Sequence, residues 1–247
     1  MTALAGRLAP SVSLILTATV DPRPVPALVR TRPEDRADEY RAALQRWSRE
    51  SRLFTRIMWW ENSNHQLAHQ IAAEFSSAVS ANVFTAEQFD SRLGKGYGEA
   101  LMLEQIAAEG IDSFYGLKCT GRLSVANIRS LLTASLDSAP DIVIRLAQDF
   151  THVDSRLFMV SSQLLREFTW NLGSEVNDDK GQYLEHAIAR RVLQLAAKGA
   201  RIGFWAGSPR YQGSSASTGL RYDSMASWLR WPVADLLYRI KRHGTFL

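Results

Sequence analysis

Residues 95–122 read KGYGEALMLEQIAAEGIDSFYGLKCTGR, and this stretch decides the kind of fold that the chain can form. A glycine-rich turn leads into a helix, and a short aromatic and apolar segment then runs into KCTGR. Gly94, Gly96 and Gly98 let the chain turn tightly and bring backbone N–H groups close to a ligand, where the positive end of the helix also points. The stretch therefore predicts an anion site suited to nucleotide phosphates. The alternative is a plain strand-to-helix turn beside a solvated Lys95.

The residues before this stretch alternate between strand and helix patterns. Apolar runs of strand length alternate with segments of helical periodicity, and prolines interrupt the chain between the first strand and the first helix. The expected strands are 11–20, 53–60 and 77–84, and the expected helices are 33–51, 65–75 and 98–109. This order predicts an α/β fold with a mostly parallel sheet that helices cover on both faces.

Polar segments follow the expected strands at their carboxyl ends. They read TATVDPRP (17–24), ENSN (61–64) and LGKGYGE (93–99). Open parallel sheets bind their ligands beyond the carboxyl ends of the strands. We therefore expect these three loops to share one ligand-binding edge.

The second half of the chain has less regular patterns. Helices are expected at 124–136, 164–172 and 181–197, strands at 141–149 and 153–158, and a short apolar segment at 202–206. The Gly- and Ser-rich segment 207–222 predicts a mobile loop. Because no linker divides the chain, we expect a single domain, 1–247.

Composition limits the possible classes of protein. The 247 residues are 46% hydrophobic and 22% charged, which supports a large buried core, and the net charge of +4 is spread along the chain. A mild, dispersed positive charge suits an anionic ligand or membrane surface better than nucleic acid, which we do not expect as a partner. Cys119 is the single cysteine, so a disulfide framework is excluded and a reducing, cytoplasmic location is expected. The sequence predicts neither a membrane-spanning segment of about 20 apolar residues nor a secretion signal.

Seven motifs together resemble small bacterial glycosyltransferases that build capsule and O-antigen polysaccharides, some of which transfer galactofuranose. The motifs are LILTATVDPRP, DRADEYRAALQRW, WENSN, KGYGE, KCTGR, VDSR and GSSASTG, and they extend over nearly the whole chain. The resemblance implies a GT-A-like fold, a hexosyltransferase activity with a nucleotide-sugar donor, UDP-sugar favoured, and a lipid-linked saccharide acceptor at the inner membrane. It also implies a nucleotide-sugar-binding half (1–123) and an acceptor-binding half (124–247).

The resemblance also implies which residues bind the donor. They come from the first strand end, the second strand end, the glycine-rich turn and KCTGR: Thr17, Ala18, Thr19, Glu61, Asn62, Lys95, Gly96, Gly98, Glu99, Lys118, Thr120, Gly121 and Arg122. Arg30 or Arg32 is expected to reach the base or the phosphates. Asn62 and Ser63 suit a helix N-terminus equally well.

The expected metal-binding motif is missing. Enzymes with a GT-A fold commonly hold a divalent metal with Asp-x-Asp, but the corresponding segment FYGLKCTGR (114–122) has no carboxylate. Lys118 and Arg122 place two cations there, and an arginine fork suits phosphate. We therefore expect no required cofactor; manganese remains possible, with Asp154 as the alternative ligand.

In an inverting transfer, the catalytic base must be a carboxylate beside the acceptor hydroxyl. Asp154, Asp178, Asp179 and Glu185 are the candidates, with Asp154 and Glu185 favoured. His152 and His186 are weaker candidates, and Glu185 can equally be a partner of the helix dipole. Four further residues are expected to contact the acceptor or the donor from loops: Arg156, Arg210, Arg221 and Tyr222.

The C-terminal segment 227–247 has an amphipathic pattern with two interpretations. Trp228, Trp231, Leu236, Leu237 and Tyr238 suit the core side of a terminal helix, which is the favoured interpretation. Together with the basic residues Arg230, Arg239, Lys241 and Arg242, they also suit a helix that lies on an anionic membrane surface.

Two other classes of protein share this pattern. A Rossmann-like methyltransferase or a nucleotide-binding module without catalysis has the same strand and helix order. The first strand lacks the glycine-rich loop of a methyltransferase, and Glu61 is the only acidic residue placed to bind a ribose.

Overall fold

The computed structural model describes residues 11–22, 31–83, 91–215 and 218–243. Its first half alternates strands and helices in the predicted order. The elements are β1 (Val12–Ala18), α1 (Pro33–Arg49), β2 (Arg56–Glu61), α2 (Gln66–Glu74), β3 (Ser80–Val83), α3 (Lys95–Glu109) and β4 (Tyr115–Thr120). The predicted α/β fold is confirmed.

The central sheet has seven strands in the order β3-β2-β1-β4-β7-β6-β8. The second half contributes β6 (Ile142–Val143), β7 (Leu157–Ser161) and β8 (Ile202–Gly203). Strands β3, β2, β1 and β4 are parallel to one another, whereas β7 is antiparallel to both β4 and β6. Strands from both halves of the chain therefore share one mostly parallel sheet.

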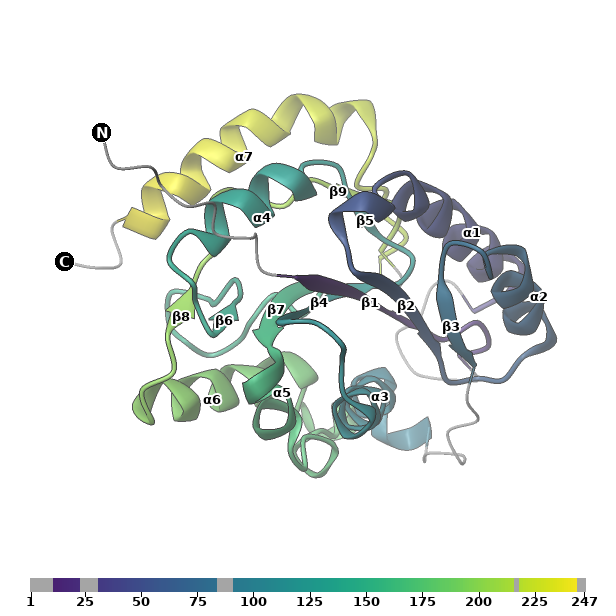
Figure 1. The fold of residues 1–247 in the computed structure, drawn as a ribbon, viewed down its shortest axis with the longest axis horizontal. Helices are drawn as coiled ribbons and strands as arrows, with labels where there is room; N and C mark the ends of the chain where they lie inside the picture. Colours follow the sequence, from purple (N-terminus) through teal and green to yellow (C-terminus); the bar gives the residue numbers. More distant parts are fainter. Residues whose placement is uncertain (1–10, 23–30, 84–90, 216–217, 244–247) are drawn as a thin grey trace.

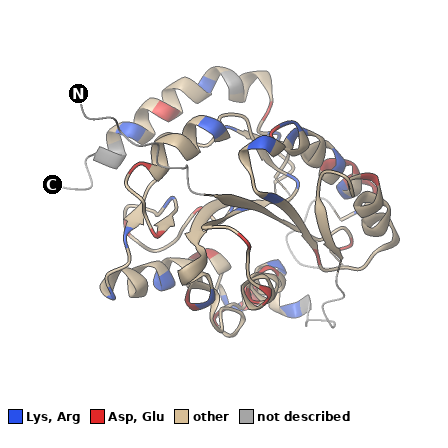
Figure 2. Cartoon of the chain, viewed as in Figure 1, with Lys and Arg blue, Asp and Glu red and all other residues tan. Residues whose placement is uncertain are grey.

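Helices cover both faces of this sheet (Figure 1). One face carries α1, α2 and α4 (Ile128–Leu136), and the other carries α3, α5 (Ser162–Thr169) and α6 (Leu184–Ala197). Each face has its own apolar cluster, because successive residues of a strand point to opposite sides: Leu14 and Leu16 join one cluster and Ile15 joins the other. Charged residues lie mainly on the helices and loops (Figure 2).

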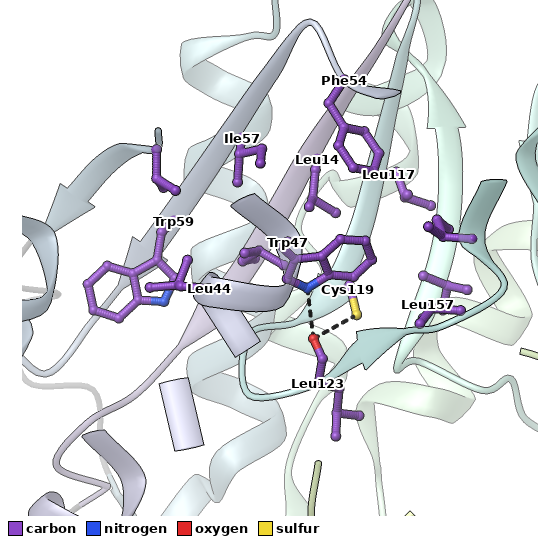
Figure 3. Close-up of a cluster of buried hydrophobic side chains, with 14 of the residues drawn as sticks. Leu14, Leu44, Trp47, Phe54, Ile57, Trp59, Leu117, Cys119, Leu123 and Leu157 are labelled. Carbon is purple, nitrogen blue, oxygen red and sulfur yellow. Dashed lines mark hydrogen bonds between the residues drawn. The ribbon is translucent and has the colours of Figure 1, made fainter. Parts of the chain in front are cut away.

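Tryptophans fill much of the core on the α1 face (Figure 3). Trp47 packs edge-on against Phe54, and its indole Nε1 donates a 2.8 Å hydrogen bond to the carbonyl of Leu123. The bond satisfies a buried donor, as burial of an indole requires. Cys119 is buried beside the same carbonyl, and burial raises the pKa of its thiol to about 12.

The second half departs from several predicted boundaries. The predicted helix 124–136 is instead the short strand β5 (Ser124–Val125) followed by α4. The predicted strand 141–149 is regular only in β6, because the chain then turns in a hairpin that a bridge between Leu146 and Val153 closes. Short apolar runs do not by themselves distinguish one strand from two strands joined by a turn.

The predicted mobility of segment 207–222 is wrong for its described part. Strand β9 (Tyr211–Gln212) pairs with β5, and Ser214 bridges to Arg221. The backbone N–H of Ser208 donates to the buried carboxylate of Asp235. These contacts hold the segment on the body of the protein.

The last helix, α7 (Met225–His243), is not the core helix that its tryptophans and leucines predicted. Leu236 and Leu237 are 59% and 51% exposed. On the side that faces the protein, Asp235 accepts from the Ser208 N–H and the Trp231 indole donates to the Ser208 carbonyl. Tyr238 is partly buried and packs against the apolar core, as predicted. The side chains of Trp228, Lys241 and Arg242 lie outside the described part.

Candidate functional site

A cavity of about 490 Å³ opens beyond the carboxyl ends of β1 and β4. We call it the edge cavity. Its lining residues come from the predicted loops of both halves of the chain. The expected residues among them are Thr17, Ala18, Thr19, Asn62, Lys95, Gly96, Gly98, Glu99, Thr120, Arg122, Asp154, Arg156, Asp178, Asp179, Glu185 and Tyr222. Arg36, Tyr40 and Tyr183 also line the cavity and were not expected there.

The end of β1 is fixed by hydrogen bonds to its neighbours. The Thr19 hydroxyl donates to the Asn62 amide oxygen at 2.7 Å, and the Thr19 N–H donates to the Tyr40 hydroxyl at 2.9 Å. Ala18 and Thr19 therefore present a rigid backbone edge to the cavity, with Asn62 beside it.

Glu61 does not line the edge cavity, contrary to expectation. It is fully buried, and its carboxylate accepts hydrogen bonds from the backbone N–H groups of Val20, Ser63 and Asn64. The carboxylate thus ties together the loops after β1 and β2, so Glu61 is a structural residue of this edge.

The glycine-rich turn has a different role from the predicted one. Helix α3 already begins at Lys95, so Gly96 and Gly98 are helical, and only Gly94 has a positive φ, +88°. The Asp178 carboxylate lies at this helix end and accepts a 3.2 Å hydrogen bond from the Gly96 N–H. A Cβ at Gly94 would lie 2.2 Å from the Asp178 carboxylate, and one at Gly96 2.8 Å. These glycines make room for Asp178, and the helix N-terminus holds an internal carboxylate.

Lys118 does not line the cavity either. Its side chain is 2% exposed, and its Nζ contacts Glu99 Oε1 at 2.5 Å and the Ser155 carbonyl at 2.6 Å. Glu99 also accepts from the Thr17 hydroxyl. Burial acts to raise the pKa of Glu99, but the charge and hydrogen bond of Lys118 outweigh it, and the pKa is lowered. The predicted phosphate role of Lys118 is wrong, because a carboxylate neutralises this lysine beneath the cavity.

Arg122 and Arg36 are the two arginines at the β1 and β4 side of the cavity. Burial, followed by the nearby charge of Arg36, lowers the pKa of Arg122. Arg122 Nε donates to the Ser214 carbonyl, and Arg36 Nε donates to the Thr19 carbonyl. The charges of Glu39 and Glu99 act on Arg122 from nearby. Two guanidinium groups on one wall suit an anionic ligand such as a phosphate.

Sequence reasoning missed Arg36 and proposed Arg30 or Arg32 instead. Arg30 lies outside the described residues, and Arg32 is exposed near Glu34. A signal was present, because Arg36 lies four residues before Tyr40 on the buried stripe of α1. An arginine on the core side of a helix marks a buried polar site.

The end of β4 lies very close to β1. The Gly121 N–H donates to the Thr17 carbonyl at 2.8 Å, and a Cβ at Gly121 would lie 2.6 Å from that oxygen. Gly121 therefore allows the backbones of β1 and β4 to approach closely. It does not line the cavity, whereas its neighbours Thr120 and Arg122 do.

Asp154 is firmly paired with Arg156. Both carboxylate oxygens receive bonds from the guanidinium, at 2.7 and 2.6 Å, and the guanidinium also stacks on the Tyr211 ring. Burial acts to raise the pKa of Asp154, but the pairing with Arg156 outweighs it and the pKa is lowered. An ionised carboxylate with both oxygens engaged is a poor proton acceptor.

Glu185 and Asp178 form an acidic wall of the cavity. Glu185 lies in the first turn of α6 and accepts a 2.8 Å hydrogen bond from the Ser155 hydroxyl through Oε1. Burial raises the pKa of Asp178, and the charge of Glu185 raises it further against hydrogen bonds from the α3 backbone. A carboxylate with a raised pKa is better suited to accept a proton near neutral pH.

Two predicted loop arginines lie elsewhere. Arg210 lies over the Trp231 ring, and Arg221 pairs with Asp223 at 3.1 Å. Neither lines the edge cavity. His152 and His186 lie near one another outside its lining, with ring centres 6.4 Å apart.

The residues of the edge cavity do not fit a divalent metal. In the described part of the chain, no group of three or more His, Cys, Asp or Glu side chains is arranged to hold one. Asp154, the predicted alternative ligand, has both oxygens occupied by Arg156. No step below depends on a metal.

The fold is similar to that of TarS from S. aureus. The TM-score is 0.52 at 10% identity, over 83% of this chain and 37% of that one, and 0.50 at 12% identity with TarS residues 1–349, over 81% and 59%. A nucleotidyl transferase from Methanothermobacter gives 0.45 at 10% identity, over 93% and 99%. No family model matches the chain, and no curated protein does.

This chain thus spans 59% of the TarS segment 1–349. Together, the seven-stranded sheet, its two helix layers and the similarity to TarS define an α/β protein with a GT-A-like fold.

Proposed function

We propose that this protein is a glycosyltransferase that moves a hexose from a nucleoside-diphosphate donor, UDP-sugar favoured, to a saccharide acceptor of a bacterial surface polysaccharide. The observation that carries the proposal is the edge cavity, where Arg36 and Arg122 lie on one wall and Asp178 and Glu185 on another. Sugar transfer needs both, because charge develops on a leaving diphosphate while a proton leaves the acceptor hydroxyl.

Each wall has a definite part in this reaction. The base and ribose lie along Thr17, Ala18, Thr19 and Asn62, and the diphosphate faces the two arginines. The acceptor oxygen attacks the anomeric carbon as the bond from that carbon to the diphosphate breaks. Glu185 or its neighbour Asp178, whose pKa is raised, accepts the hydroxyl proton. Arg36 and Arg122 stabilise the negative charge on the departing diphosphate without a required metal.

Calorimetry with UDP, GDP, CMP and S-adenosylmethionine, each with and without manganese, tests the donor site. We expect metal-independent micromolar binding of UDP. We expect Arg122→Gln to weaken it about tenfold or more, since hydrogen bonds to charged groups contribute about 1.5–3 kcal/mol. Arg221→Gln is the matched control and leaves affinity unchanged. Binding of S-adenosylmethionine alone, or of no nucleotide, contradicts the proposal.

We also infer that α7 holds the protein on an anionic membrane, where a lipid-linked saccharide is found. Its outer face carries six exposed apolar residues, Met225, Leu229, Val233, Leu236, Leu237 and Ile240. Exposed Arg230 and Arg239 flank this face. An apolar stripe bordered by cations is typical of helices that lie in the membrane interface. No described helix is long and apolar enough to cross a membrane.

A further inference from the structure

A second cavity of about 490 Å³ lies beside the edge cavity. We call it the hairpin cavity, because the hairpin between Leu146 and Val153 forms much of its wall. Arg145, Phe150, His152, Phe204 and Tyr238 also line it. Val153, Asp154 and Arg156 line both cavities, so the Asp154–Arg156 ion pair is a shared wall.

Phe150 is held in an unfavourable conformation at the tip of the hairpin. Its φ is +60°, and its side chain is 49% exposed. The Phe150 N–H donates to the Ala147 carbonyl, and Asp149 accepts bonds from the N–H and hydroxyl of Thr151. Glycine or asparagine usually occupies such a position, since a bulky side chain is strained at positive φ. The hairpin therefore holds an aromatic ring at the cavity rim at a cost to stability, which is characteristic of a functional position.

Arg145 gives the hairpin cavity a positive charge. Its guanidinium lies 5.2 Å from the centre of the Tyr238 ring. Its charge reaches the Asp154 carboxylate, whose two oxygens are already bonded to Arg156. An exposed aromatic ring stacks on the C–H face of a sugar, and a guanidinium fork fits phosphate.

We propose that the hairpin cavity binds the acceptor as a saccharide that carries a phosphate group, with the sugar on Phe150 and the phosphate against Arg145. This inference rests on the proposed function. The shared wall then places an acceptor hydroxyl next to the edge cavity, where Glu185 lies. Phe150 is a specificity-determining residue for the sugar and Arg145 for the phosphate.

Ligand-observed NMR with four hexose 1-phosphates tests the proposal. The probes are the 1-phosphates of glucose, galactose, mannose and N-acetylglucosamine, each compared with the free sugar, with UDP at saturation to fill the edge cavity. We expect at least one sugar phosphate to bind at millimolar concentration and its free sugar to bind at least tenfold more weakly. Arg145→Gln reduces the affinity for the phosphate to that for the free sugar.

Phe150→Gly separates binding from folding. Glycine adopts a φ of +60° without strain, so we expect an unfolding temperature at or above that of the native protein and a sugar-phosphate affinity at least tenfold lower. Trp170→Ala, which removes an aromatic side chain that is 74% exposed elsewhere, is the control and leaves binding unchanged.

Three outcomes contradict the inference: no sugar phosphate binds, both variants bind as the native protein does, or Trp170→Ala weakens binding equally. If UDP binds and the sugar phosphates do not, only the acceptor inference fails. If UDP itself does not bind, the proposed function fails.

Discussion

At the scale of single residues, Lys118 and Glu99 form an ion pair beneath the edge cavity. The lysine is almost fully buried and the glutamate is one-quarter exposed. Removal of one partner from such a pair leaves a buried charge without compensation, whereas removal of both is much less costly. Each charge of the pair therefore neutralises the other beneath the ends of β1 and β4. The net contribution of the pair to the free energy of unfolding is smaller than the loss that either single substitution would cause.

Substitution of this pair gives a direct test of its role. We expect Lys118→Met to lower the free energy of unfolding by about 3 kcal/mol, because Glu99 then lies partly buried beside an apolar side chain. In the double variant Lys118→Met with Glu99→Gln, at least about 1.5 kcal/mol should be regained. Urea unfolding followed by circular dichroism measures both. Additive losses would contradict the pairing.

The same pair makes stability depend on pH. The pKa of Glu99 is lower in the folded protein than its usual value of 4.5. The stabilisation is thus complete above pH 4.5 and is lost as the pH falls through the lower, folded-state pKa. In Lys118→Met the lysine no longer lowers the pKa of Glu99, and burial raises it. Protonation of Glu99 in acid should then no longer lower the free energy of unfolding. Urea midpoints between pH 3 and 6 measure the difference, and parallel curves for both proteins would contradict it.

At the scale of elements, Gly94 at the N-terminus and Gly110 at the C-terminus of α3 both have positive φ, +88° and +81°. They differ in their surroundings. Asp178 fills the space beside Gly94, while nothing lies within 4 Å of a Cβ at Gly110. A side chain at Gly110 would therefore meet backbone strain alone, whereas one at Gly94 would meet both backbone strain and a steric conflict with Asp178.

Alanine at each of the two positions measures that difference. We expect Gly110→Ala to cost about 1–3 kcal/mol, because a φ of +81° with a ψ of 174° is a conformation that almost only glycine adopts. Gly94→Ala should cost more, because it must also displace Asp178 from the α3 terminus. Thermal and urea unfolding report the costs, and Gly94→Ala in an Asp178→Gly background should fall back toward the Gly110→Ala value. Equal costs for both single variants would show that Asp178 moves freely.

At the scale of the whole molecule, α7 lies along the outside of the α4 side and leaves its apolar stripe exposed (Figure 1). Met225, Leu229, Val233, Leu236 and Ile240 recur at steps of three and four, so they share one side of the helix. The rest of the described protein does not bury them, and a contiguous exposed apolar face of this kind is typical of an interaction surface.

Sedimentation with vesicles of anionic and neutral lipid tests whether that partner is a membrane. We expect the native protein to bind anionic vesicles. Leu229→Gln, Leu236→Gln and Ile240→Gln combined should weaken binding about a hundredfold, at roughly 1 kcal/mol for each side chain. Arg230→Gln should reduce the salt dependence. Leu193→Gln with Trp170→Gln is a matched control, since both residues are exposed apolar residues elsewhere. A native dimer that the triple variant converts to monomer, with unchanged vesicle binding, would contradict the membrane inference.

The sequence by itself determined the α/β class and the elements of the first half. Period-two and period-3.6 patterns, prolines and glycines act locally, so β1, α1, α2 and α3 lie close to their predicted ranges. The rule that parallel strands bind ligands at their carboxyl ends also predicted the edge that carries the edge cavity.

Only the tertiary structure decided what each charged residue does there. Lys118, Glu61 and Asp154 look like site residues in the sequence, but Glu99, a set of backbone N–H groups and Arg156 engage them. Arg36 lines the cavity from α1, and its place on the buried stripe of that helix is the sign of this role in the sequence. The physical reason is that a charge acts through its neighbours in space. Glu99 lies 19 residues from Lys118 along the chain and Val20 lies 41 residues from Glu61, so no local pattern contains these pairs, whereas Arg156 is only two residues from Asp154.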